Sequence, residues 1–128
     1  MILINNKKIL VIEDNPSALR LMVYTLEKKS YQVITASDGL GGLRKARDEH
    51  PGLIILDIML PGLDGYEVCR QLRQKPETAT LPILLLSAKA HQDDKDIGLR
   101  VGANDYLTKP VDPSTIVAKV ETLLTGTS

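Results

Sequence analysis

Leu53-Ile54-Ile55-Leu56-Asp57 is the stretch that decides the fold, because four consecutive apolar residues end abruptly at a carboxylate. A short, continuous apolar run is typical of a strand buried on both faces of a parallel sheet. Four further segments are predicted to be strands, at residues 8–12, 31–35, 83–86 and 105–108. Each strand is followed by residues with helical spacing, and this alternation predicts an α/β fold with a doubly wound, parallel sheet.

The helix that follows the first strand begins near Pro16, with Asn15 as its cap. Its buried stripe is expected to contain Leu19, Met22, Val23 and Leu26. The second helix, capped by Ser37 or Asp38, is predicted to turn Leu40, Leu43 and Ala46 inward. The third is predicted at residues 66–74, where Cys69 belongs to the apolar stripe and is interpreted as a core residue.

The fourth helix is expected to be the least stable, because Asp93 to Asp96 are polar and Gly98 interrupts it. The fifth helix begins near Pro113. Its inward side is predicted to contain Ile116, Val117, Val120, Leu123 and Leu124. The whole chain of 128 residues is therefore interpreted as one domain with a core at about residues 7–124 and a frayed end at 125–128.

The composition excludes several classes of protein. Apolar residues make up 43% and charged residues 25%, which is ordinary for a globular domain and excludes a disordered or collagen-like chain. Sixteen basic residues balance sixteen acidic ones, so we expect neither nucleic acid nor an anionic membrane to be attracted by the overall charge. With one cysteine, no apolar run long enough for a membrane span and no signal-peptide pattern, the expected location is the cytoplasm.

The chemistry is expected where the strands end, because ligands of open α/β sheets bind beyond the carboxyl ends of the strands. Glu13 and Asp14 follow the first strand, Asp57 ends the third, and Ser87 and Lys109 follow the fourth and fifth. Three gathered carboxylates repel one another, by about 4 kcal/mol for a pair ~4 Å apart at an effective dielectric of 20. A bound cation is therefore implied.

Carboxylate oxygens without histidine or cysteine favour Mg²⁺ over zinc or copper, with Mn²⁺ as an alternative ion. Mg²⁺ keeps several waters and often binds a phosphate oxygen. Asp57 can itself attack phosphorus and become an aspartyl phosphate. The ammonium of Lys109 would neutralise the transferred group, and the hydroxyl of Ser87 would hydrogen-bond to it.

Four segments in this order resemble the response-regulator receiver domain, a CheY-like domain of two-component signalling systems. The segments are Ile9-Leu10-Val11-Ile12-Glu13-Asp14-Asn15, Leu56-Asp57-Ile58-Met59-Leu60-Pro61-Gly62-Leu63-Asp64-Gly65, Leu86-Ser87-Ala88 and Gly102-Ala103-Asn104-Asp105-Tyr106-Leu107-Thr108-Lys109-Pro110. The resemblance spans about residues 8–124. It implies five strands in the order 2-1-3-4-5 with helices on both faces.

The resemblance also implies roles for individual residues. Asp57 would accept the phosphoryl group, Asp14 and Asp57 would bind Mg²⁺ directly, Glu13 would bind through water, and Met59 would bind by its backbone carbonyl. Lys109 and Ser87 would contact the phosphoryl group, and Tyr106 would be the aromatic switch residue. Met59 and Lys89 would tune the lifetime of the phosphoryl group, and Lys109-Pro110 would be a cis peptide.

The implied phosphodonor is a phosphohistidine on a sensor histidine kinase or a histidine phosphotransfer protein. Phosphorylation would act on a downstream protein or on self-association through the fourth helix, fifth strand and fifth helix. The chain itself would be a signalling phosphoacceptor that assists its own phosphorylation and dephosphorylation, whether as a stand-alone regulator or as part of a longer protein.

Three alternative functions stay open. An aspartyl-phosphate phosphatase would have an Asp-x-Asp pattern after its first strand, where this chain has Glu13-Asp14-Asn15-Pro16. A flavodoxin-like carrier would need a phosphate cradle in the first loop, where Asp14 would repel a flavin phosphate. A receiver-like domain used only for docking would not need the complete acidic set.

Overall fold

The computed structural model describes residues 5–88 and 92–125, and within them five strands alternate with five helices. The elements are β1 (Asn5–Ile12), α1 (Pro16–Glu27), β2 (Gln32–Ala36), α2 (Gly39–Glu49), β3 (Pro51–Asp57), α3 (Gly65–Gln74), β4 (Ile83–Ser87), α4 (Gln92–Arg100), β5 (Asp105–Thr108) and α5 (Pro113–Thr125). All paired strands are parallel, in the order β2-β1-β3-β4-β5. The predicted fold class and strand order are confirmed. Thr125, predicted to belong to the frayed end, is the last residue of α5. The interpretations of Lys89 and of residues 126–128 concern residues outside the described part.

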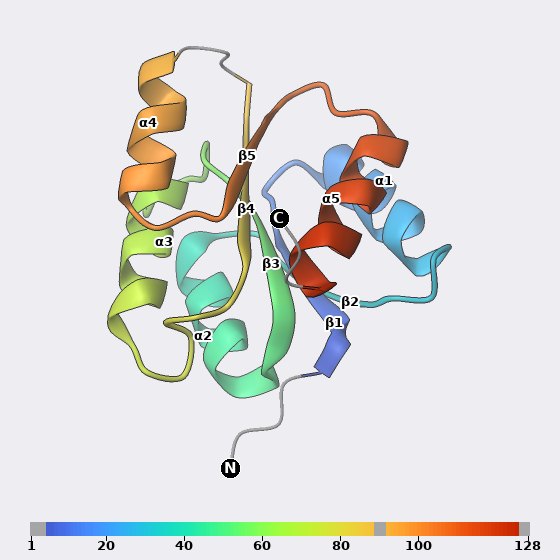
Figure 1. Cartoon of the computed structure of the whole chain (residues 1–128), viewed down its shortest axis with the longest axis horizontal. Helices are drawn as coiled ribbons and strands as arrows, with labels where there is room; N and C mark the ends of the chain where they lie inside the picture. The colour runs from blue at the N-terminus through green and yellow to red at the C-terminus, as the bar shows by residue number, and fades with distance from the viewer. Residues whose placement is uncertain (1–4, 89–91, 126–128) are drawn as a thin grey trace.

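The sheet lies between two layers of helices, with α1 and α5 on one face and α2, α3 and α4 on the other (Figure 1). Alternate residues of each strand therefore enter different cores. On β3, Ile54 and Leu56 pack toward the α2 and α3 side, and Leu53 and Ile55 pack toward α1 and α5. This double burial explains why the deciding stretch is apolar at every position rather than at alternate ones.

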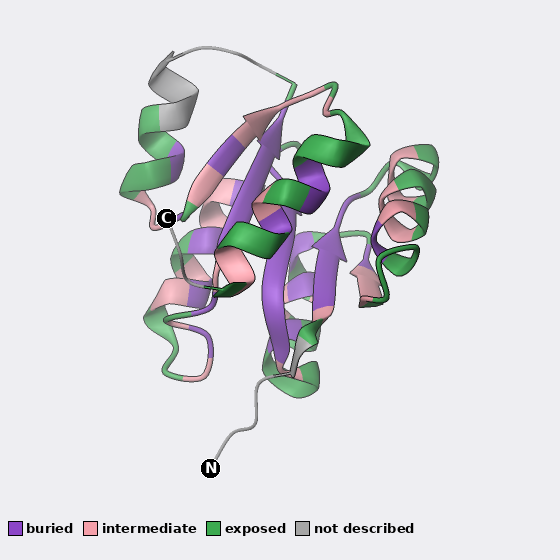
Figure 2. Ribbon diagram, turned by 45° about the vertical axis from the view of Figure 1, so that its right-hand side comes forward, coloured by how far each residue is buried: buried purple, intermediate pink, exposed green. Residues whose placement is uncertain are grey.

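The central strands form the buried centre of the molecule (Figure 2). Every residue of β3 and of β4 is buried, whereas the edge strand β2 is mostly half-exposed. The described helices include none with the length and apolar character that crossing a membrane requires. The hydrophobic faces of these helices are instead used in packing on the sheet.

The helix caps form as predicted. The side chain of Asn15 accepts a hydrogen bond from the N–H of Ala18, and that of Asp38 accepts one from Gly41. The prediction that Leu40 faces inward is wrong, since Leu40 is 66% exposed. The reason is the close approach of α2 to the sheet at Gly42, where a Cβ would lie 2.3 Å from the side chain of Ile12. This contact sets the rotation of α2, and Leu40 lies outside it.

The prediction that Gly98 interrupts the fourth helix is wrong. The helix continues through it to Arg100, and Gly98 is buried. A Cβ at this position would lie 2.9 Å from Leu85 Cδ1 and 3.4 Å from Tyr106 Cδ2. Gly98 therefore allows α4 to approach β4 and β5 closely.

Arg73, in the last turn of α3, joins two loops at the end of the sheet where β4 and β5 begin. Its guanidinium donates to the carbonyls of Leu81 at 2.7 Å and Gly102 at 2.9 Å, and to Asn104 Oδ1 at 2.7 Å. The same Asn104 oxygen accepts the N–H of Ile83 at 2.9 Å. One cation thus connects the α3–β4 loop to the turn between α4 and β5.

Candidate functional site

The strand register brings the predicted polar residues to one edge of the sheet. Ile12 lies beside Leu56, so Glu13 and Asp57 follow at neighbouring positions. Ser87 lies beside Thr108, which places Lys109 just beyond the end of β4. Residues far apart in the sequence therefore meet because parallel strands end together.

Asp57 is the centre of this group. Its residue is only 4% exposed, and its carboxylate accepts two hydrogen bonds. Oδ2 lies 2.7 Å from the ammonium of Lys109, and Oδ1 accepts the backbone N–H of Met59 at 2.9 Å. A charged donor on one oxygen and a backbone donor on the other fix the orientation of the carboxylate.

Glu13 is buried beside Asp57. Its Oε1 lies 2.8 Å from Lys109 Nζ, and its Oε2 accepts the N–H of Asn15 at 3.1 Å. Asp14 is exposed at the rim. One carboxylate oxygen from each of Glu13, Asp14 and Asp57 lies within 4.8 Å of the others. The structure therefore brings together the acidic set and the lysine that the sequence predicts for this edge.

The electrostatics of the site reflect burial and crowding. Burial raises the pKa of Glu13, and the neighbouring Asp57 raises it further, against the lowering effects of Lys109 and the Asn15 N–H. Burial lowers the pKa of Lys109, but its hydrogen bonds to Asp57 and Glu13 outweigh this effect, and the pKa is raised. With three carboxylates and one ammonium, the group carries an excess of negative charge.

The loop after β3 packs closely against the site. Gly65 donates its N–H to the carbonyl of Ile58 at 3.0 Å, and a Cβ on Gly65 would lie 2.5 Å from the carbonyl oxygen of Asp57. Any side chain at residue 65 would therefore displace backbone at the site. In the sequence, Gly65 stands out only as part of a segment that resembles the family, and this contact is not predicted. The side chain of Met59 is 60% exposed, as expected of a loop residue.

The remaining predicted site residues lie on or beside β4 and β5. Ser87 is the buried last residue of β4, and its carbonyl accepts the N–H of Lys109 at 2.6 Å. Tyr106 is 9% exposed and packs in the core on the side of α2 and α3. The Lys109-Pro110 bond is cis, as the family resemblance implies. Cys69 is fully buried as a free thiol, which agrees with its interpretation as a core residue.

The acidic set fits a small, hard cation. Mg²⁺ binds oxygen at about 2.0–2.1 Å, so two oxygens on opposite sides of one ion lie about 4.2 Å apart. The oxygens of Glu13, Asp14 and Asp57 already lie within 4.8 Å of one another, and the group contains neither histidine nor cysteine. Because only two ligands can lie opposite each other on an octahedral ion, the third oxygen would move closer or reach the ion through water, as expected for Glu13.

Residues 9–121 match the family model described as the response regulator receiver domain. The chain belongs to this family. It is 53% identical over 119 residues to the alkaline phosphatase synthesis transcriptional regulatory protein PhoP of Bacillus subtilis, covering 93% of this chain but 49% of PhoP. It is 39% identical over 119 residues to protein PilH of Pseudomonas aeruginosa, covering 93% of this chain and 98% of PilH. The receiver-domain chain thus spans about half the length of PhoP and nearly all of PilH.

Solved receiver structures share the fold. The chemotaxis protein CheY4 of Vibrio cholerae superimposes with a TM-score of 0.87 at 31% identity, covering 91% of this chain and 97% of CheY4. The receiver domain of the sensor histidine kinase PA1611 of Pseudomonas aeruginosa has a TM-score of 0.86 at 32% identity, covering 92% of this chain and 97% of that domain. That structure has a magnesium ion coordinated in the active site cleft.

Proposed function

We propose that this receiver domain accepts a phosphoryl group on Asp57, from a phosphohistidine of a sensor histidine kinase or a histidine phosphotransfer protein. The observation that carries the proposal is the buried Asp57 carboxylate, held by Lys109 at 2.7 Å inside an acidic group at the sheet edge. An Asp57 oxygen attacks phosphorus, and the P–N bond breaks with its electron pair returning to the imidazole. The product is an aspartyl phosphate.

Each residue of the site has a part in this reaction. The Met59 N–H holds one Asp57 oxygen in place. Lys109 is the charge partner of the incoming group, because the phosphoryl group brings more negative charge than the carboxylate alone. Ser87, buried at the end of β4, supplies a hydroxyl for a further oxygen. The domain acts in the cytoplasm as a signalling phosphoacceptor and not as a turnover enzyme.

Asp14 and Asp57 would hold Mg²⁺ directly, with Glu13 bound through water and Met59 through its backbone carbonyl. The ion would supply neutralising charge for the phosphoryl oxygens. The supporting observations are the all-oxygen donor set and the excess negative charge of the group.

The direct test is the intact mass after incubation with acetyl phosphate and Mg²⁺. Wild type should gain one phosphoryl group that hydroxylamine removes, and Asp57→Asn should gain none. Asp48→Asn removes an exposed carboxylate of α2 and should label like wild type. Labelling that persists in Asp57→Asn, or an acid-stable phosphate, would refute the assignment.

The metal site is tested separately by thermal unfolding. Mg²⁺ at one hundred times its Kd should stabilise the wild type by about 2.7 kcal/mol relative to EDTA. The Mg²⁺ effect should shrink in Asp57→Asn and stay unchanged in Asp48→Asn. Equal stability of the wild type in Mg²⁺ and EDTA would contradict the site.

We further propose that phosphorylation is transmitted to a partner, or to self-association, through the face formed by α4, β5 and α5. Ile97 and Leu99 of α4 are 37% and 47% exposed, and Lys119 of α5 lies 2.7 Å from Asp105 of β5. Gly98, which lets α4 approach the sheet, lies next to the ring of Tyr106 in β5. β5 pairs with β4 from Asp105 to Thr108, which lies beside Ser87, so the strand connects the end of the site to this face. We expect a coupling of about 1–3 kcal/mol.

Beryllofluoride with Mg²⁺, as a stable substitute for the phosphoryl group, tests the switch by amide chemical shifts. In wild type, the shifts should extend through residues 96–124. In Ser87→Ala, the shifts of these residues should be lost. The same measurement on Tyr106→Ala shows whether the ring is required. Shifts confined to residues 13–14, 57–61 and 87–88 would contradict the proposed switch.

A further inference from the structure

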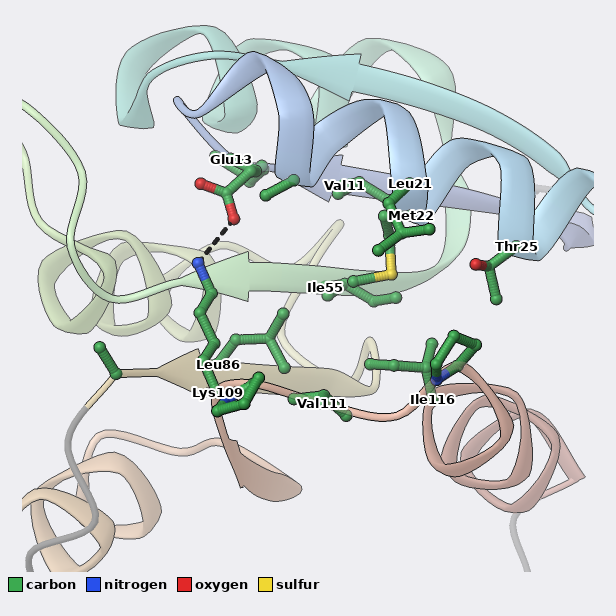
Figure 3. A pocket seen from close by; sticks show the side chains of 15 residues that line it. Val11, Glu13, Leu21, Met22, Thr25, Ile55, Leu86, Lys109, Val111 and Ile116 are labelled. Carbon is green, nitrogen blue, oxygen red and sulfur yellow. Dashed lines mark hydrogen bonds and ion pairs between the residues drawn. The ribbon is translucent and has the colours of Figure 1, made fainter.

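A cavity of about 460 Å³ lies between α1, α5 and the sheet, next to the candidate phosphoacceptor site (Figure 3). Its floor is formed by Val11, Ile55 and Leu86 of three neighbouring strands. Met22 of α1 and Ile116 of α5 lie on opposite sides of it. Small-molecule sites in proteins have about this size and this mainly apolar lining.

The sequence explains why this space exists. Protein interiors are normally close-packed, and a space between two helices persists where the facing side chains are too short to meet. The side chains of α1 that line the cavity include Ala18 and Thr25, and the whole chain contains neither phenylalanine nor tryptophan. Leu21, at the rim, is 56% exposed, so an apolar molecule could reach the cavity from solvent.

The polar groups at one end indicate the charge of a suitable ligand. Glu13 and Lys109 line that end and are joined to each other by a 2.8 Å ion pair, which Figure 3 shows as a dashed line. Each of these two lining groups already has an opposite charge beside it, and the further negative charge of Asp14 and Asp57 lies outside the lining. A charged ligand would therefore gain no free partner in the cavity and would lose its hydration. Apart from Thr25, the remaining lining is apolar and favours the burial of apolar surface.

We infer that this cavity binds a small, uncharged and mainly apolar molecule between α1 and α5. Its body would contact Val11, Met22, Ile55 and Ile116, and one end would lie against the Glu13–Lys109 pair. The cavity adjoins the acidic group that would bind Mg²⁺ and shares Glu13 with it, and it shares Lys109 with the candidate phosphoacceptor site.

The test uses three probes with the same phenylethyl body and different charge: 2-phenylethanol, 2-phenylethylamine and 3-phenylpropanoate. Binding is measured from methyl and amide chemical shifts in EDTA without a phosphodonor, so the result is independent of the proposed phosphorylation. The neutral probe should give saturable shifts at the methyl groups of Val11, Met22, Ile55 and Ile116. Its affinity should exceed that of either charged probe at least tenfold.

Matched variants locate the binding. Thr25→Met places a longer side chain in the cavity and should weaken the neutral probe at least tenfold, whereas Thr122→Met makes the same change on the exposed side of α5 and should have no effect. Ala18→Leu fills the cavity from a second position and replaces Thr25→Met if that variant loses its native shifts. Three results would each overturn the inference: no saturable shifts in wild type, equal binding of the charged probes, or undiminished binding in the folded cavity variant.

Discussion

Lys109 Nζ lies 2.7 Å from Asp57 Oδ2, although the two residues are 52 positions apart in the chain. The same ammonium lies 2.8 Å from Glu13 Oε1. The two carboxylate side chains are only 5–6% exposed, whereas the lysine side chain is 29% exposed. Lys109 is therefore the cation that lets two buried carboxylates share one edge of the sheet without metal.

Lys109→Gln should lower the free energy of unfolding of the metal-free protein more than the substitution of an exposed surface lysine does. Breaking a buried ion pair costs about 3–5 kcal/mol, and the partial exposure of Lys109 places the expected loss near the lower end, about 3 kcal/mol. Lys119→Gln is the control, because its pair with Asp105 is more exposed and should be worth less than about 1 kcal/mol. Urea unfolding in EDTA at pH 7 measures both. Similar losses in the two variants would contradict the special role of Lys109.

Glu13 should give the metal-free protein a characteristic pH dependence. Its pKa is raised above the ordinary 4.5, first by burial and then by Asp57. A raised pKa means that the folded state holds the proton more tightly, so this contribution to stability is complete below about pH 4.5 and is lost as pH rises through the folded pKa. Wild type should therefore lose stability relative to Glu13→Gln over that range.

The exposed Glu27 of α1 provides the matched control. Glu27→Gln makes the same chemical change at a carboxylate that is not buried in the site, so it measures the effect of the substitution itself. The measurement is the free energy of unfolding in EDTA at several pH values. A wild type that gains stability relative to Glu13→Gln as pH rises would show that the hydrogen bonds from Lys109 and Asn15 outweigh burial.

The fold was predictable from sequence because its strands are buried on both faces. A continuous run such as Leu53-Ile54-Ile55-Leu56 then identifies a strand without knowledge of its neighbours, and the carboxylate that ends it marks the edge of the sheet. Asn15 and Asp38 were predictable for a similar local reason, since a cap bonds to its own helix.

The features that were not predictable depend on distances between elements. Leu40 has the right spacing for an inward position, but the close approach of Gly42 to Ile12 decides the rotation of α2. Periodicity also could not show that Arg73 connects two loops, or that α1 and α5 leave a cavity between them. In each case the deciding partner is distant in sequence, and a single sequence contains no signal for it.

Substitution of Arg73 should lower the free energy of unfolding far more than substitution of an exposed arginine in the same helix. Its guanidinium donates to backbone carbonyls of Leu81 and Gly102 and to the Asn104 side chain. Arg73→Met would leave these acceptors without their charged donor, with an expected loss of about 3 kcal/mol or more. Arg70→Met, one turn away, removes only an exposed pair with Glu67 and should change stability by less than about 0.5 kcal/mol. Denaturant unfolding measures both variants, and equal losses of stability would contradict the role of Arg73 in connecting the two loops.

Gly98→Ala separates two explanations of the glycine in α4. If Gly98 only weakens the helix, alanine should stabilise the protein by about 1 kcal/mol through helix propensity. The structure predicts otherwise, because the new Cβ would lie 2.9 Å from Leu85 Cδ1 and 3.4 Å from Tyr106 Cδ2. Leu85 is completely buried, and overpacking of such a site costs about 1–3 kcal/mol. The expected net result is a loss of up to about 2 kcal/mol, together with shifted ring signals of Tyr106.

Gly41→Ala makes the same change in α2, where the nearest atom to the new Cβ is Asp38 Oδ1, the cap of the helix, at 3.0 Å. This control should change the free energy of unfolding little, because the gain in helix propensity is set against a small displacement of the cap. It should leave the Tyr106 signals unchanged. Thermal unfolding and ring NMR spectra of the two variants give the comparison. If Gly98→Ala gained the full helix-propensity energy with Tyr106 undisturbed, the close approach of α4 to β4 and β5 would not be the reason for a glycine at this position.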